Sequence, residues 1–225
     1  MNTFSAVTTP PEIYTPADAR LLLWPQIIPE PTGWQLYSEL HSTLPWQQDQ
    51  ITIYGKTLPV PRLQVWMGDP GAHYQYSGLA LSPQPWSQTV TAIKQRVETI
   101  CCHHFNSVLI NLYRSGQDSN GWHSDDEPEL GENPVIASFN LGATRRFRLR
   151  HKYRKDIQPY TFDLTSGSLL LMAGTTQKYW QHCLTKTARP VEPRINLTFR
   201  RVITASPTNN GQKTDRKVIT GKARH

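Results

Sequence analysis

Cysteine is scarce in this sequence, which contains only Cys101, Cys102 and Cys183. An odd number without a CxxC pair argues against a disulfide framework and favours a reducing, intracellular setting. Residues 101–104 read Cys-Cys-His-His. Adjacent side chains diverge, and no second pair follows at a zinc-finger spacing, so we interpret this run as the end of a helix.

Long apolar runs are also missing. The best of them, residues 21–24, is ended by Pro25, whereas a membrane span needs about 18 apolar residues. The first residues lack the basic and apolar segments of a secretory signal. We therefore expect no membrane partner and a location inside the cell, either the cytoplasm or nucleoid of a bacterium or the nucleus of a eukaryote.

Charge is sparse and unevenly distributed. Charged residues make up 18% of the chain and the net charge is +7. Residues 1–100 carry five basic and seven acidic side chains, residues 101–200 carry 13 and nine, and residues 201–225 carry six and one. A basic surface in the later part of the chain suggests a polyanionic partner such as nucleic acid. A basic surface without any partner is the alternative.

Helices are expected only in the first half of the chain. Residues 33–44 and 86–100 have the apolar periodicity of amphipathic helices, the first with Thr32 as its cap, and residues 50–66 read as a hairpin with Tyr54 near its tip. Short strands follow without intervening helices, which suggests a mainly β fold with flanking helices, either a sandwich or a jelly roll. The expected strands cover residues 107–113, 134–141, 145–153, 160–164, 168–172, 179–183 and 194–203.

We expect three segments. Residues 1–17 read as a loosely held arm with three prolines, residues 18–203 as a single domain, and residues 204–225 as a basic, disordered tail.

The first chemical motif is His123-x-Asp125. Alternate residues of an extended segment point to the same face, so an imidazole and a carboxylate can take adjacent positions on a metal. His182 lies in an apolar strand and is the candidate for a third ligand, which would complete the 2-His-1-carboxylate arrangement of non-haem Fe(II) oxygenases. A buried histidine with a purely structural role is the alternative for His182.

The second motif is the strand sequence RINLTFR at residues 194–200. Its polar residues Arg194, Asn196, Thr198 and Arg200 alternate onto one face. Two inward-facing arginines are costly to bury unless an anion pairs with them. A dicarboxylate such as 2-oxoglutarate would satisfy both, with bidentate geometry. A solvated polar face is the alternative.

The third motif is a basic strand in which apolar and cationic residues alternate. Its cations share one face and could follow the phosphates of a nucleic acid, although a solvated sheet edge is also compatible with them. They are Arg146, Arg148, Arg150, Lys152 and Arg154. Further phosphate candidates are Lys56, Arg62, Lys186 and Arg189.

Together these motifs resemble the AlkB family of Fe(II)- and 2-oxoglutarate-dependent nucleic-acid dealkylases, and most closely the subgroup of the animal duplex-DNA repair homologue. The resemblance covers about residues 50–203 and is densest in VLINLYRSGQDSNGWHSDDE, SFNLGATRRFRLRHK, LTSGSLLLMAG and PRINLTFR. It implies a double-stranded β-helix (jelly roll) core over about residues 105–203. A nucleotide-recognition hairpin and loop over about residues 50–80 would precede it in the same dioxygenase domain.

The resemblance also implies roles for individual residues. Fe(II) would be held by His123, Asp125 and His182, with O2 as a co-substrate. Residues of two strands would contact 2-oxoglutarate, with Arg194 at one carboxylate and Arg200 at the other end. The full implied set is Asn111, Tyr113, Arg194, Asn196, Thr198 and Arg200.

A flipped base would stack between Tyr76 and His123, and the Tyr54 hairpin would fill the gap that the base leaves. The remaining implied contacts shape the base pocket or reach phosphates. The full substrate-binding set is Tyr54, Arg62, Tyr74, Tyr76, Ser77, Asp126, Glu127, Arg148, Lys152 and Arg189.

The leading hypothesis is a monomeric repair enzyme that demethylates 1-methyladenine and 3-methylcytosine in single- or double-stranded DNA and releases formaldehyde, succinate and CO2. An RNA or single-strand demethylase of the same chemistry is the first alternative. An oxygenase acting on proteins or small molecules is the second. A non-enzymatic binding module is disfavoured because every metal and co-substrate position is filled.

Overall fold

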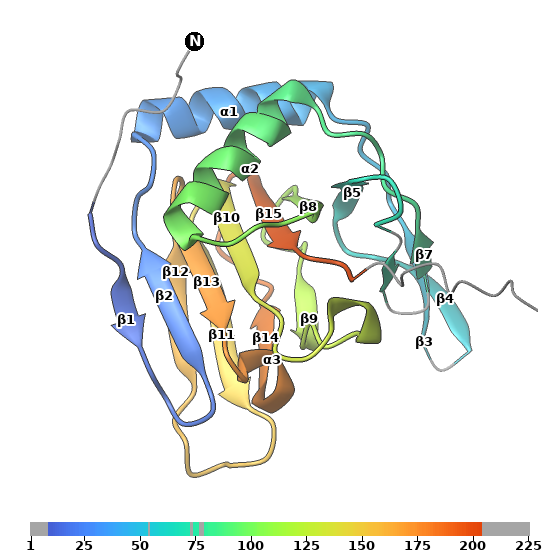
Figure 1. Ribbon diagram of the computed structural model, residues 1–225. Helices are drawn as coiled ribbons and strands as arrows, with labels where there is room; N and C mark the ends of the chain where they lie inside the picture. Colours follow the sequence, from blue (N-terminus) through green and yellow to red (C-terminus); the bar gives the residue numbers. More distant parts are fainter. Residues whose placement is uncertain (1–8, 54, 73, 77–78, 204–225) are drawn as a thin grey trace, which may run out of the picture.

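Two antiparallel β-sheets face each other, and two helices cover the outer side of the larger sheet (Figure 1). The computed structural model describes residues 9–53, 55–72, 74–76 and 79–203, with the backbone alone for residues 52–53, 74–76 and 79–81. None of the helices in this described part has the length and hydropathy needed to cross a membrane. The predicted fold class, mainly β with flanking helices and a jelly-roll core, is confirmed.

The larger sheet has seven strands in the order β1-β2-β13-β10-β15-β8-β5. Its central strands are buried over their whole length, as expected for strands covered on both faces. The strands are β1 (Glu12–Tyr14), β2 (Arg20–Trp24), β5 (Leu63–Gly68), β8 (Ser107–Tyr113), β10 (Ile136–Gly142), β13 (Leu169–Ala173) and β15 (Arg194–Arg200).

The smaller sheet has four strands in the order β12-β11-β14-β9. Its inner face packs on the larger sheet through side chains such as Phe147, Leu149 and Phe162. The strands are β9 (Asn120–His123), β11 (Arg145–His151), β12 (Tyr160–Leu164) and β14 (Trp180–Leu184). A four-residue helix, α3 (Thr176–Tyr179), comes directly before β14, and a single 3₁₀ turn, η1 (Pro128–Leu130), follows β9.

The two long helices are α1 (Glu30–Thr43) and α2 (Gln88–Cys101). In α2 the residues Val90, Ile93 and Val97 are buried, as the periodicity predicted. The prediction that Thr32 caps α1 was wrong, because the helix begins at Glu30 after Pro29. Proline is tolerated in a first helical turn, where its missing N–H is not needed, so Pro31 does not delay the start.

Most strand predictions are confirmed within a few residues, and β8 and β12 have the predicted bounds. The prediction of a loosely held arm over residues 1–17 was wrong for β1, which pairs with β2 along its whole length. Residues 1–8 and the predicted disordered tail, 204–225, lie outside the described residues.

Two small hairpins lie beyond β5, on the right in Figure 1. They are β3 (Gln50–Ile53) with β4 (Lys56–Pro59), and β6 (Tyr74–Tyr76) with β7 (Leu79–Leu81). The first hairpin was predicted, but its return strand was predicted too long. Proline cannot donate to a strand ladder, and β4 ends at Pro59, after which the chain turns into β5 of the larger sheet.

Candidate active site

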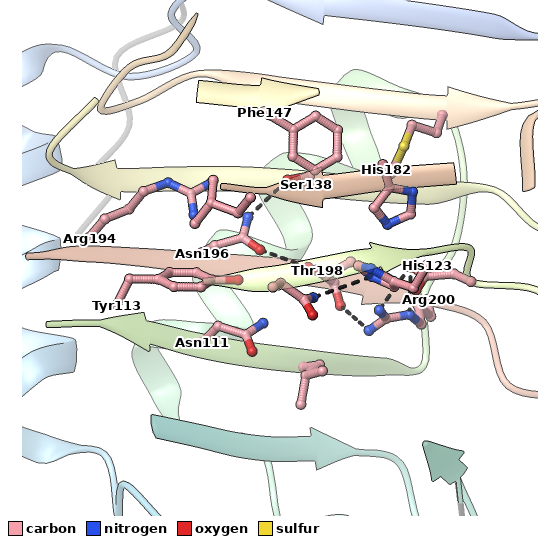
Figure 2. Close-up of a pocket in the computed structure, with 15 residues that line it drawn as sticks. Asn111, Tyr113, His123, Ser138, Phe147, His182, Arg194, Asn196, Thr198 and Arg200 are labelled. Carbon is pink, nitrogen blue, oxygen red and sulfur yellow. Dashed lines mark hydrogen bonds and ion pairs between the residues drawn. The ribbon is translucent and has the colours of Figure 1, made fainter. Parts of the chain in front are cut away.

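A pocket lies between the inner faces of the two sheets. Strands β8, β10 and β15 supply one wall, and strands β9, β11 and β14 supply the other. Figure 2 shows Arg194 at one end of the pocket and His123, His182 and Arg200 grouped at the other end. A single elongated cavity therefore connects a histidine cluster with a buried arginine.

His123, Asp125 and His182 come together at one end. β9 and β14 are neighbours, and His123 and His182 are direct partners in their register, so both side chains point into the pocket. One ligand atom from each of the three residues lies within 4.8 Å of the others. The prediction that His182 is the third member of the cluster is confirmed, although 57 residues separate it from Asp125 in the sequence.

Both imidazoles are arranged as neutral ligands. The Nδ1 atom of His123 lies 2.8 Å from the carbonyl oxygen of Gly121, and a carbonyl can only accept, so Nδ1 carries the proton. Burial lowers the pKa of His123. Burial and the neighbouring His123 lower the pKa of His182 to about 3. Neutral imidazole is the form that binds a metal.

Arg200 holds the carboxylate of Asp125 in place. Its Nη2 and Nε atoms donate to the Oδ2 atom of Asp125 at 2.9 and 3.2 Å, and both side chains are buried. Burial alone would raise the pKa of Asp125, but the charge and the hydrogen bonds of Arg200 outweigh it, and the pKa lies at about 2. The implied contact of Arg200 with 2-oxoglutarate stays a prediction, since its guanidinium bonds to Asp125 and also lines the pocket.

The other oxygen of Asp125 is available for a metal. Its Oδ1 atom is buried without a hydrogen-bond partner among the described residues, and it lies 3.8 Å from the Nε2 atom of His123. Adjacent ligand atoms on an octahedral ion with bonds of about 2.1 Å lie about 3 Å apart. The distance between these two atoms would therefore need to shorten by less than about 1 Å for both to bind one metal ion. The residues fit Fe(II) in the two-histidine, one-carboxylate arrangement, which leaves open coordination positions.

Arg194 lies at the opposite end and is almost fully buried. Its Nη2 atom donates to the Oδ1 atom of Asn140, while its Nε atom has no hydrogen-bond partner among the described residues. Burial lowers the pKa of Arg194 to about 10, and the Tyr113 ring lies 5.3 Å from its Cζ atom. A buried cation with an unsatisfied donor suits a carboxylate, so this end fits one end of a dicarboxylate.

Polar side chains line the space between the two ends. Asn111 accepts hydrogen bonds from Arg62 and Gln64, both at 2.9 Å, which leaves its amide nitrogen as a donor for the pocket. Asn196 and Thr198 are joined to each other by a hydrogen bond of 2.9 Å. All the implied 2-oxoglutarate contacts, Arg200 included, therefore line the pocket.

The implied substrate contacts are less well placed. Arg62 is buried and bonds to Asn111 and to the Ser119 carbonyl, so the prediction that it contacts phosphates was wrong. Asp126 pairs with Lys152 at 2.8 Å, so two implied contacts neutralise each other.

The other implied substrate contacts do not line the pocket, or they are residues that the structure does not describe in full. Glu127 is half-buried and comes two residues after Asp125 in the sequence. Arg148 lies on β11, and Arg189 lies in the exposed loop before β15. Tyr74 and Tyr76 are described by backbone alone, as parts of β6. Tyr54 and Ser77 lie outside the described residues.

Several pocket residues were not predicted from the sequence. Ser138 and Asn140 face the pocket from β10, and their alternation in an otherwise apolar strand was a detectable signal. Gln177 in α3 is fully buried, and its Oε1 atom accepts from the Asp125 backbone N–H at 2.9 Å. No periodicity marks Gln177, because a four-residue helix is too short to show one.

Comparison with known proteins gives consistent matches. The family model described as the 2OG-Fe(II) oxygenase superfamily matches residues 20–200. The chain is 38% identical over 192 residues to human alpha-ketoglutarate-dependent dioxygenase alkB homolog 3, covering 82% of this chain and 66% of that protein. It is 40% identical over 160 residues to human DNA oxidative demethylase ALKBH2, covering 68% of this chain and 61% of that protein. The chain thus spans slightly less than two thirds of each human relative.

A solved structure, described as the structure of OsALKBH1, matches with a TM-score of 0.57 and 15% identity. The match covers 85% of this chain and all of that one. At this identity the likeness concerns the fold, and it agrees with the two-sheet architecture.

Proposed function

This chain belongs to the AlkB family within the 2OG-Fe(II) oxygenase superfamily, and from that premise we propose that it removes N-alkyl groups oxidatively from nucleic-acid bases. The observation that carries the proposal is the single pocket with His123, Asp125 and His182 at one end and Arg194 at the other. The names of the relatives, a dioxygenase and a DNA oxidative demethylase, support the same chemistry.

Fe(II), 2-oxoglutarate and O2 supply the oxidising chemistry when bound, and the residues of the chain arrange it. His123, Asp125 and His182 hold the ion, and Arg200 fixes the Asp125 carboxylate so that the Oδ1 atom faces it. Arg194 neutralises one carboxylate of the co-substrate at the far end. The apolar side chains of Leu109, Phe147 and Met172 line the pocket and limit water near the reacting groups.

The proposed substrates are 1-methyladenine and 3-methylcytosine in DNA. Hydroxylation of an N-methyl carbon gives a hemiaminal, which collapses to formaldehyde and the unmodified base, while 2-oxoglutarate becomes succinate and CO2. The target base must leave its stack to reach a pocket between two sheets, at a cost of a few kcal/mol. We further propose that the protein acts as a monomer inside the cell.

The strand preference separates two versions of the proposal. Similarity to both alkB homolog 3 and ALKBH2 leaves duplex DNA, single-stranded DNA and RNA as candidate substrates. Tyr54 comes between β3 and β4 in the sequence and lies outside the described residues. Loss of turnover on duplex but not on single-stranded oligonucleotide in Tyr54→Ala would favour a duplex enzyme, and equal effects on both would favour a single-strand enzyme.

Formaldehyde release from a methylated oligonucleotide tests the proposal directly. We expect release by the wild-type chain with Fe(II) and 2-oxoglutarate, and a loss of at least about a hundredfold in His123→Ala, because a facial site cannot hold iron well with one ligand missing. His104→Ala is the matched control, since its side chain is 93% exposed and remote from the pocket. No release by the wild-type chain from any methylated strand would contradict the proposal.

A further inference from the structure

The outer face of the smaller sheet carries a cluster of arginines around one tryptophan. Trp122 precedes His123 in β9, so its side chain points away from the pocket while His123 points into it. The Trp122 ring lies 4.2 Å from the Cζ atom of Arg150 and 5.9 Å from the Cζ atom of Arg148. We call Trp122, Arg148, Arg150 and Gln181 the outer cluster.

Ion pairing leaves the positive charge of the basic strand concentrated at this cluster. Three of the five cations predicted as a phosphate stripe pair with carboxylates, and the other two, Arg148 and Arg150, pair with none among the described residues. The pairs are Arg146 with Asp163 at 3.3 Å, Lys152 with Asp126 at 2.8 Å and Arg154 with Asp156 at 2.7 Å. A paired cation attracts a distant phosphate less strongly, because its partner cancels its field.

The guanidinium of Arg150 is also held in a fixed orientation. It lies against the indole of Trp122, and its Nε and Nη2 atoms donate to the Oε1 atom of Gln181 at 3.3 and 3.0 Å. A guanidinium has five N–H donors in a planar fork, so donors remain for a ligand after the two bonds to Gln181. Stacking on an aromatic ring reduces the entropy lost when such a fork binds a phosphate.

We propose that the outer cluster is a phosphate clamp for the backbone of the bound nucleic acid. Arg148 and Arg150 contact the phosphates, and Trp122 is a positioning residue that holds both guanidinium groups. Because Trp122 and His123 are neighbours on opposite faces of β9, the clamp fixes the backbone at a constant offset from the metal cluster. This inference rests on the proposed function, since it requires a nucleic-acid substrate.

The test measures the affinity of the purified full chain for an unmodified single-stranded oligonucleotide over a range of salt concentrations. Arg148→Ala and Arg150→Ala should each reduce the slope of log affinity against log salt by about 0.7, the value for one lost phosphate contact on a single strand. Trp122→Leu removes no charge, yet it should weaken binding about three- to tenfold, because the arginines lose their support. Arg146→Ala, on the same strand and face but already paired, should change affinity by less than about twofold.

A double-mutant comparison separates positioning from a general loss of structure. In the Arg148→Ala/Arg150→Ala background, Trp122→Leu should change affinity little, because no guanidinium remains to be positioned. If Trp122→Leu does not fold, Trp122→Phe keeps a weaker aromatic support and should give an intermediate affinity. Thermal unfolding and Co(II) binding of each variant report the fold and the metal site independently.

Three results would overturn the proposal. If neither arginine substitution changes the salt slope, Arg148 and Arg150 do not contact phosphates. If the Trp122 variants keep full affinity for the oligonucleotide, Trp122 does not position the arginines. The proposed demethylation would survive both results, because formaldehyde release tests it separately. A wild-type chain that binds no oligonucleotide would overturn the clamp together with the nucleic-acid substrate.

Discussion

At the residue scale, the pair formed by Arg200 and Asp125 explains how a buried carboxylate stays ionised and correctly oriented. Both hydrogen bonds from Arg200 go to one oxygen of Asp125, and the other oxygen faces His123. Sequence reasoning correctly expected a buried anion next to Arg200, since an unpaired buried arginine is costly. Asp125 was not predicted as a partner of Arg200, because pairing across 75 residues cannot be read from strand alternation.

Replacing Arg200 should therefore damage the metal site. Arg200→Met leaves Asp125 buried without its partner, which costs about 3–5 kcal/mol of stability and raises the pKa of the carboxyl group. We expect Co(II) affinity at pH 7 to fall about 10- to 100-fold, measured by the absorbance of the bound ion. Arg200→Lys keeps the charge without the two-point contact and should give a Co(II) affinity between those of the wild type and Arg200→Met. Wild-type Co(II) affinity in Arg200→Met would contradict this role.

The lowered histidine pKa values predict how many protons are released when a metal binds. Two histidines with the ordinary pKa of about 6.5 would together release roughly 1.5 protons at pH 6. Here burial lowers the pKa of His123, and burial together with His123 lowers that of His182 to about 3. His182 is then already neutral at pH 6, and a smaller fraction of His123 is protonated than in an ordinary histidine, so less proton release is expected.

Calorimetric titration with Co(II) in buffers of different ionisation enthalpy measures this release. We expect less than one proton at pH 6 and less still at pH 7. Release of more than one proton at pH 6, falling as the pH rises to 7, would show that the histidines titrate normally and that the metal-free cluster is more solvated than the structure indicates.

At the scale of elements, the site depends on strand pairings that the sequence indicates only partly. Alternation located β8 and β15, and it placed Arg194, Asn196 and Thr198 on one face correctly. It could not show that β9 pairs with β14, because the two strands are far apart in the chain and the pairing contains an irregularity. The burial of Arg62 was not predicted for a similar reason. Arg62 bonds to Asn111 of β8, and the sequence does not show that β8 lies next to β5.

The short helix α3 is the element that sequence reasoning missed most clearly. Its residue Gln177 accepts a hydrogen bond from the Asp125 backbone, and the carbonyl oxygen of Gln177 accepts one from Lys152. Ser124 donates to the Trp180 carbonyl at 2.8 Å. The segment after β9, which carries a metal ligand, is therefore tied to the segment that leads into β14, which carries another.

Gln177→Leu should loosen this connection. The substitution leaves the Asp125 N–H buried without an acceptor, at a cost of about 1–3 kcal/mol, and we expect Co(II) affinity to fall about tenfold. Lys178→Ala, at the next position of the same helix, is the control and should bind Co(II) as the wild type does. Equal affinities for all three proteins would mean that α3 does not position the ligand.

At the scale of the whole molecule, two apolar clusters stabilise the fold. One apolar cluster lies between the helices and the larger sheet, and a second lies between the two sheets around the pocket. The family match over residues 20–200 includes the first cluster, most of the second and every residue of the candidate site. The small hairpins lie at the side of this core (Figure 1).

The central claim is that one pocket couples 2-oxoglutarate turnover to removal of an alkyl group from a nucleic-acid base. Parallel measurement of succinate and formaldehyde, with the full chain, Fe(II) and an oligonucleotide that carries 1-methyladenine, tests this coupling most directly. We predict equal amounts of the two products, and far less succinate with the same oligonucleotide unmethylated. Succinate without formaldehyde, formed at the same rate on both oligonucleotides, would contradict it.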